Sequence, residues 1–134
     1  MKPTLLDTDT LSLHLKGHPQ VTRHMQTYVE EYGIVQFSLI THYEILNGLF
    51  YKDAHGQYSR YYNLLQASRL LPLTPESVRM AARISADLRA MGQPIGHTDV
   101  LIAGVAIANN LQLATNNSRH FERIGGLQLT NWTL

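Results

Sequence analysis

The hydrophobic and polar positions of this chain alternate between short apolar runs and longer segments with helical spacing. In the segment 76–91, for example, Val78, Ala81 and Leu88 recur at intervals that place them on one face of a helix. The segment 98–109 is apolar on nearly all sides, which predicts a buried helix. Helices are predicted over residues 10–15, 19–32, 39–50, 56–69, 76–91 and 98–109. Short strands are predicted over residues 4–6, 34–37, 70–73, 111–114 and 127–129.

Strands that alternate with helices of this length are typical of parallel βαβ units, so the pattern predicts an α/β sandwich with a parallel sheet. The length of 134 residues suits one domain with a single core, and we expect residues 1–134 to form it. In open sheets of this kind, ligands bind outside the carboxyl ends of the strands, near the switch in strand order. The residues that follow the strands are therefore the first candidates for a site.

The composition is that of a globular protein, with 44% hydrophobic and 16% charged residues. Cysteine is absent, which excludes disulfides and thiolate metal sites and fits a reducing compartment. The opening "MKPTLLDTDT" does not resemble a signal peptide, and the longest apolar run, 100–108, is too short to cross a membrane. We expect a cytoplasmic protein without membrane association. The net charge of +1 does not by itself predict nucleic-acid binding.

Carboxylates follow the first predicted strand directly, in the segment "LLDTDTLS". Asp7 stands where that strand ends, and Asp9 two residues later. Taken singly, each is more commonly explained as the cap of the next helix. The segment 115–117 follows the strand 111–114 and should reach the same edge of the sheet.

Two further carboxylates have unusual neighbourhoods. Glu44 has no basic residue one helical turn away, although the spacing Thr41-x-x-Glu44 also matches a capping box. Asp99 opens the apolar helix, where the helix dipole alone would favour it. His97 is the one histidine that we expect near a substrate. If Asp7, Glu44 and Asp99 meet at one sheet edge, their charges repel unless a cation lies between them. Mg²⁺ or Mn²⁺ would suit such a site and could activate water against a phosphodiester.

Three blocks of the chain, in this order, resemble PIN-domain ribonucleases of the VapC toxin type: "LLDTDTLS", "FSLITHYEILNG" and "GQPIGHTDVLIAGVAIANNLQLATNNSRHFERIGGLQLTNW". The resemblance covers essentially the whole chain. It implies a three-layer α/β/α sandwich with a mainly parallel central sheet, and RNA hydrolysis at a Mg²⁺ or Mn²⁺ site. By position, Asp7, Glu44 and Asp99 correspond to the catalytic metal ligands, and Thr115 to a hydroxyl residue that lines the site.

The chain departs from the fullest family pattern at two positions. Asn117 stands where many members carry a fourth acid, which removes one negative charge and argues against a tightly held second metal. With Thr115, it is expected to position water or phosphate. Asp9 stands where the family usually has asparagine, and we interpret it chiefly as the cap of the following helix. Asp9, Asn116 and Arg119 are weaker site candidates, the arginine as a contact to RNA phosphate.

The resemblance also implies partners and products. These are an RNA substrate cut to 5′-phosphate and 3′-hydroxyl ends, a cognate antitoxin, and a homodimer. Two alternatives remain at this stage. Asn117 keeps open a catalytically weakened module that only binds a partner. The spacing of Asp7 and Asp9 resembles phosphatases of the haloacid-dehalogenase type, but the lysine and acidic pair expected downstream are missing, since the only lysines are Lys2, Lys16 and Lys52.

Overall fold

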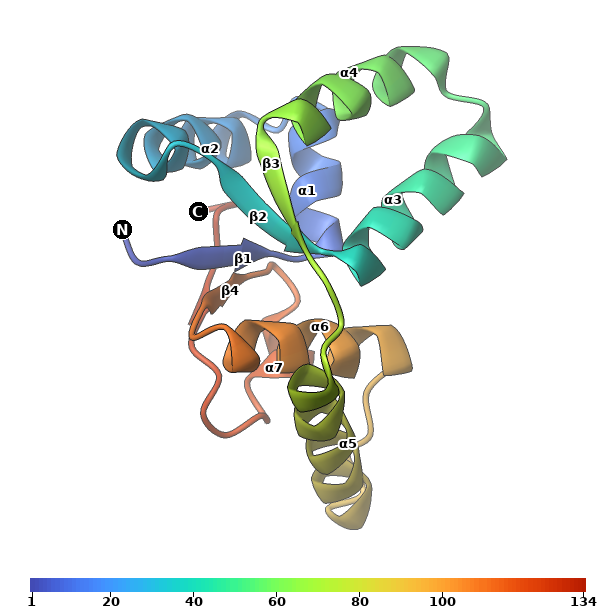
Figure 1. Ribbon diagram of the computed structural model, residues 1–134, viewed down its shortest axis with the longest axis vertical. Helices are drawn as coiled ribbons and strands as arrows, with labels where there is room; N and C mark the ends of the chain where they lie inside the picture. The colour runs from blue at the N-terminus through green and yellow to red at the C-terminus, as the bar shows by residue number, and fades with distance from the viewer.

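A computed structural model describes all residues from 1 to 134. Five parallel strands form one sheet in the order β3-β2-β1-β4-β5, surrounded by seven helices (Figure 1), which confirms the predicted α/β fold. The strands are β1 (Thr4–Leu6), β2 (Val35–Ser38), β3 (Ser68–Leu71), β4 (Gln112–Ala114) and β5 (Leu129–Thr130). The helices are α1 (Thr8–Leu15), α2 (Pro19–Tyr32), α3 (Leu39–Lys52), α4 (His55–Gln66), α5 (Pro75–Ala90), α6 (His97–Ala108) and α7 (Ser118–Phe121).

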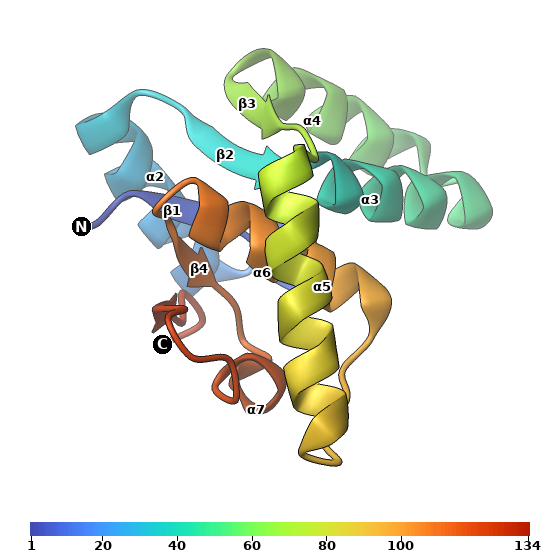
Figure 2. The ribbon, with the colours of Figure 1, turned by 60° about the horizontal axis from the view of Figure 1, so that its bottom comes forward.

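The helices cover both faces of the sheet, which confirms the three-layer α/β/α sandwich. On one face, Leu6 and Phe37 of the sheet pack into a core with residues of α1, α2, α3 and α4. On the other face, Leu5 and Leu113 pack into a second core with residues of α5, α6 and α7. Figure 2 shows α5 lying across α6 on that second face. Successive strand residues point to opposite faces, so β1 places Leu5 in one core and Leu6 in the other.

The region around β3 differs from its prediction. The helix expected over residues 56–69 ends at Gln66, and the strand begins at Ser68 rather than Leu70. The Ser68 hydroxyl donates to the Leu64 carbonyl at 2.6 Å and satisfies a carbonyl at the helix end. Residues 68–71 then pair in parallel with β2. Pairing with a neighbouring strand thus overrides the local helical spacing, which carried no information about that neighbour.

The carboxyl end of β1 lies at the centre of the sheet edge. Leu6 is in register with Phe37 of β2 on one side and with Ala114 of β4 on the other. From β1 the chain continues to β2 and β3 on one side of β1. It then crosses over to β4 and β5 on the other side. This is the switch point in strand order where ligands of parallel sheets bind, and Asp7 is the residue that follows β1 there.

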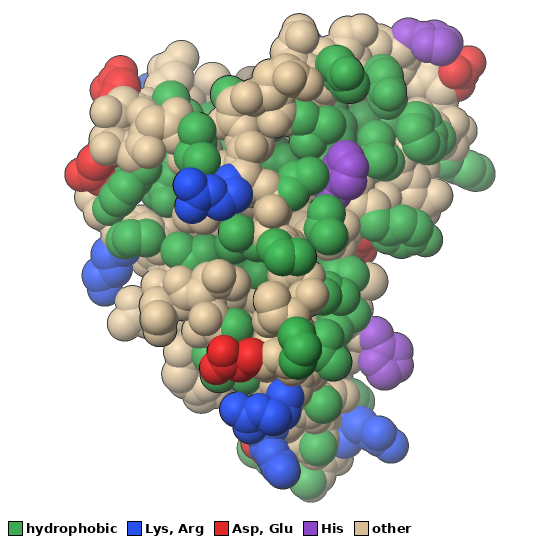
Figure 3. Space-filling view, in the orientation of Figure 1, with side chains coloured by type: hydrophobic (Ala, Val, Ile, Leu, Met, Phe, Trp, Pro, Cys, Tyr) green, Lys and Arg blue, Asp and Glu red, His purple; other side chains and the backbone are tan.

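The surface carries large apolar side chains along α3 and α4 (Figure 3). Tyr51 is 91% exposed, and Tyr43 and Phe50 are each 63% exposed. Neighbouring Tyr58 and Tyr62 stack on each other, with ring centroids 6.4 Å apart. None of the helices combines the length and apolar character that a membrane crossing requires.

Candidate metal centre at the sheet edge

Asp7 links the end of β1 to the start of α1. Its carboxylate accepts a hydrogen bond from the Thr10 backbone N–H at 2.7 Å, which makes it the N-cap of the helix. The Thr10 hydroxyl donates in turn to the Ala114 carbonyl at 3.0 Å and ties this turn to β4. The helix therefore starts at Thr8, two residues earlier than predicted. The interpretation of Asp9 as the cap is wrong, since Asp9 lies inside the first turn.

Burial dominates the electrostatics of Asp7. Its side chain is 4% exposed, and loss of hydration raises the pKa of this carboxyl from 3.8 to about 6. Hydrogen bonds from Thr115 and Thr10 favour the charged form and lower the pKa in part, while the nearby charge of Asp9 raises it further. A buried carboxylate that is this costly to ionise would gain from a cation beside it.

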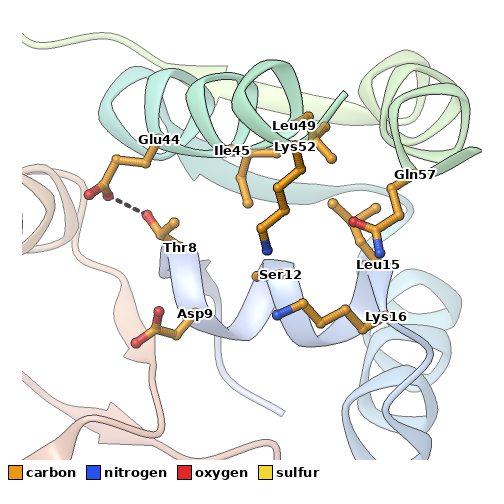
Figure 4. Close-up of a pocket in the computed structure, with 11 residues that line it drawn as sticks. Thr8, Asp9, Ser12, Leu15, Lys16, Glu44, Ile45, Leu49, Lys52 and Gln57 are labelled. Carbon is orange, nitrogen blue, oxygen red and sulfur yellow. Dashed lines mark hydrogen bonds between the residues drawn. The ribbon is translucent and has the colours of Figure 1, made fainter. Parts of the chain in front are cut away.

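Glu44 points from α3 toward the start of α1. The capping-box interpretation is wrong, because Ser38 caps α3 by accepting from the Thr41 N–H at 3.1 Å. Glu44 instead accepts a hydrogen bond from the Thr8 hydroxyl at 2.6 Å (Figure 4), and that hydroxyl lies 3.1 Å from the Thr41 hydroxyl. Two helices thus fix the half-buried Glu44 carboxylate at the sheet edge.

Asp99 comes from the opposite layer. It lies in the first turn of α6, whose N-cap Gly96 provides no side-chain hydrogen bond. Its side chain is 29% exposed, and burial raises its pKa, although the His120 ring 3.5 Å away lowers it. The same imidazole nitrogen lies 3.0 Å from the amide nitrogen of Asn117. His120 therefore connects the acid of α6 with the segment that follows β4.

One small pocket brings the predicted residues together. Its volume is about 70 Å³, several times the roughly 10–15 Å³ that one water needs. Carboxylates from three different segments line it, together with one side-chain amide and two apolar side chains. The lining residues are Asp7, Thr8, Asp9, Glu44, Asp99, Ile102, Asn117 and Phe121.

Other candidates lie outside this acidic pocket. Thr115 is buried behind it, where its hydroxyl accepts from the Asn117 N–H at 2.9 Å and interacts with Asp7. Asn116 and Arg119 are exposed and do not line it. His97 belongs to a separate pocket between α5 and α6.

Sequence reasoning missed Thr8 and His120. Thr8 stands inside "DTDT" and His120 inside "SRHF", and neither segment has a pattern that distinguishes these side chains from exposed polar ones. Their partners, Glu44 and Asp99, are 36 and 21 residues away in the chain, so only the fold brings them together. Thr8 donates a hydrogen bond to the Glu44 carboxylate, and His120 lies beside that of Asp99. Each therefore helps to position one carboxylate of the pocket.

The donors of the acidic pocket suit a hard divalent cation. They are oxygen atoms of carboxylates, an amide and a hydroxyl, which Mg²⁺ prefers. No lysine or arginine forms an ion pair with Asp7, Glu44 or Asp99, and the one basic side chain beside them is His120, 3.5 Å from Asp99. As the side chains stand, no three acids or histidines converge on a single ion position. Mg²⁺ keeps several waters when proteins bind it, so full convergence is not required.

Comparisons with known proteins agree with this geometry. The PIN domain family pattern matches residues 4–127. Ribonuclease VapC1 of Haemophilus influenzae (strain R2866) is 30% identical over 131 residues, covering 96% of this chain and 97% of that protein. The tRNA(fMet)-specific endonuclease VapC of Shigella flexneri is 45% identical over 51 residues, 38% of this chain and 39% of that protein. A chain in the crystal structure of DNA-bound VapBC from Salmonella typhimurium superposes with a TM-score of 0.88 at 27% identity, covering 98% of this chain and 99% of that one. The chain therefore belongs to the PIN-domain family, among its VapC members.

Proposed function

We propose that this protein is an endoribonuclease and the toxin of a toxin–antitoxin pair, which hydrolyses RNA phosphodiesters with a divalent cation. The observation that carries the proposal is that Asp7, Glu44 and Asp99, from three different elements, line one pocket at the switch point of the sheet. The nuclease names of the relatives support the same reaction class. The family match leaves nothing in favour of the haloacid-dehalogenase alternative.

In this proposal the three carboxylates hold Mg²⁺ or Mn²⁺. When bound, such a cation supplies a water of lowered pKa and offsets the charge that develops on the phosphodiester. Thr10 and Thr115 orient the Asp7 carboxylate, and Thr8 orients that of Glu44. These fixed hydrogen bonds reduce the rearrangement that cation and substrate binding would require.

Asn117 adds a neutral oxygen donor to the pocket, and His120 lies against its amide. An amide can orient water or a phosphate oxygen but contributes no charge to cation binding. We therefore assign one cation, rather than two, to the acidic pocket. Attack of water at phosphorus with cleavage of the bond to the 3′-oxygen, which leaves protonated, gives the 5′-phosphate and 3′-hydroxyl ends that the family resemblance implies.

A cognate antitoxin would keep the nuclease inactive in the cytoplasm. The related Salmonella chain was crystallised as a VapBC assembly bound to DNA, which supports a protein partner for this chain. The exposed aromatic side chains along α3 and α4, among them Phe50 and Tyr51, offer an apolar surface for a protein partner. A homodimer remains a prediction of the family resemblance.

The proposal is tested with antitoxin-free protein and labelled RNA, first tRNA(fMet) because the Shigella relative is named for it. Cleavage is expected in Mg²⁺ or Mn²⁺ and not in EDTA, and the products should carry 5′-phosphates. Products with 2′,3′-cyclic phosphates, or equal cleavage in EDTA, would contradict the proposed chemistry. Folded protein that cuts none of several RNAs would instead favour the weakened binding module. Induced expression in a bacterium should arrest growth, and coexpressed antitoxin should restore it.

A further inference from the structure

A second pocket, of about 120 Å³, lies between α1 and α3 and adjoins the acidic pocket. Its far end is lined by Lys16 of α1 and Lys52 of α3. Figure 4 shows both ammonium groups directed toward Ser12, from the two walls of the pocket. We call this end the lysine pocket. The residues that line both pockets are Thr8, Asp9 and Glu44.

The two lysines have no partner within the protein. Neither ammonium group forms an ion pair or a hydrogen bond, whereas that of the remaining lysine, Lys2, donates to Gln128 at 3.2 Å. Lys16 is the C-cap of α1 and Lys52 the last residue of α3, positions where the helix dipole favours a cation. The dipole accounts for each lysine separately. It does not account for both lysines lining one pocket, where neither forms an ion pair with the Asp9 or Glu44 carboxylate that lines it too.

We propose that Lys16, Lys52 and the Ser12 hydroxyl bind one backbone phosphate of single-stranded RNA, next to the phosphate that is cut. The inference rests on the proposed function. An RNA strand that follows the surface between α1 and α3 would meet the acidic pocket first and the lysine pocket next, because the two share a wall. The two ammonium groups offer only hydrogen-bond donors and two full positive charges to a phosphate, and the Ser12 hydroxyl can donate as well.

The lysine pocket would set the position of the strand and carry no base preference. Contacts to phosphate fix the register of a nucleic acid without reading its sequence. With a net charge of only +1, the chain as a whole attracts RNA weakly, so a local pair of lysines matters more. A phosphate bound in the lysine pocket would keep the neighbouring phosphodiester at the acidic pocket, although Asp9 and Glu44 repel it.

The test measures RNA affinity in an Asp99→Asn background, so that the RNA stays uncut. Fluorescence anisotropy with a labelled single strand gives the Kd at several salt concentrations. Lys16→Gln/Lys52→Gln should raise the Kd about tenfold at low salt, at about three- to fourfold per exposed lysine. Loss of one phosphate contact should also reduce the slope of log Kd against log salt by about 0.7.

Two control variants make the result specific to this pocket. Lys2→Gln/Arg79→Gln removes the same number of positive charges from other exposed positions and should leave Kd and slope unchanged. Lys16→Arg/Lys52→Arg keeps the charge and should bind within about twofold of the parent. Melting temperatures should be similar for all variants, because the exchanged side chains are exposed.

Two results would overturn the proposed role of the lysine pocket. The first is an unchanged Kd in Lys16→Gln/Lys52→Gln, and the second an equal loss of affinity in the charge-matched control. The first result together with weaker antitoxin binding would assign the lysines to the protein partner. RNA cleavage by the wild-type chain in Mg²⁺ distinguishes failure of the lysine-pocket proposal from failure of the proposed function. If it cuts RNA while the glutamine variant cuts with the same kcat/KM, only the lysine pocket is wrong, whereas absence of wild-type cleavage refutes the nuclease itself.

Discussion

Exchange of Asp7 for asparagine should stabilise the protein at neutral pH while it removes a proposed metal ligand. Asp7 is almost fully buried, and its pKa of about 6 means that the folded protein resists ionising it. The difference from the ordinary value of 3.8 corresponds to about 3 kcal/mol. Asparagine has nearly the same shape, can still accept from the Thr10 N–H, and is an equally good N-cap.

The direction of this pH dependence follows from the number of protons that the folded and unfolded states bind. Between about pH 4 and pH 6 the folded protein keeps a proton on Asp7 that the unfolded chain has released. The contribution of this group to the free energy of unfolding is therefore complete below pH 4 and is lost as pH rises through 6. The Asp7→Asn variant has no such loss. It should match wild type near pH 4 and exceed it by about 2–3 kcal/mol at pH 7.5.

The assay is urea unfolding of both proteins in EDTA at several pH values, because a bound cation would favour the charged carboxylate. For a chain of this length the difference at pH 7.5 corresponds to a rise in melting temperature on the order of 10 °C. Asp87→Asn, at an exposed acid 3.7 Å from Arg83, is the control and should change stability by less than about 1 kcal/mol. An Asp7→Asn variant no more stable than wild type at pH 7.5, or a difference independent of pH, would refute the reasoning.

Three further predictions concern packing, capping and metal binding. Gly104→Ala would press a methyl group against the Ser77 carbonyl where α5 crosses α6, and should cost about 1–3 kcal/mol in urea unfolding, whereas Gly48→Ala meets open space and should cost nothing. Ser38→Ala removes the cap of α3 and should cost about 1 kcal/mol, so an unchanged midpoint would contradict that cap. Millimolar Mg²⁺ should raise the melting temperature of wild type and not of Asp99→Asn, and equal shifts would contradict cation binding there.

The position of the site could be predicted because it depends on strand ends. Asp7 follows a short apolar run that the sequence predicts as a buried strand, and a parallel sheet brings the carboxyl ends of its strands to one edge. The same architecture predicted Glu44 and Asp99 near that edge, and the family resemblance pointed to the same two acids, although helical spacing alone does not tell which layer a helix joins. The structure brings all three to one pocket.

The errors arose where local signals compete. Asp7 and Asp9 are both good caps, and only the tight exit from β1, where the Asp7 carboxylate meets the Thr10 N–H, decides between them. Thr41-x-x-Glu44 fits a capping box, but Ser38 lies closer to the true helix start and leaves Glu44 free for Thr8. The choice in each case depends on contacts between segments distant in the chain.

The most direct test of the central claim compares the kcat/KM of RNA cleavage for wild type, Asp99→Asn and the exposed-acid control Asp87→Asn, all in Mg²⁺. Asp99 lines the acidic pocket together with the other acids and Asn117, whereas Asp87 lies on the surface of α5. Loss of one ligand of the cation should reduce kcat/KM at least about 100-fold, and the control should retain it. Equal rates in wild type and Asp99→Asn would show that RNA is cut elsewhere and would contradict the assignment of this pocket.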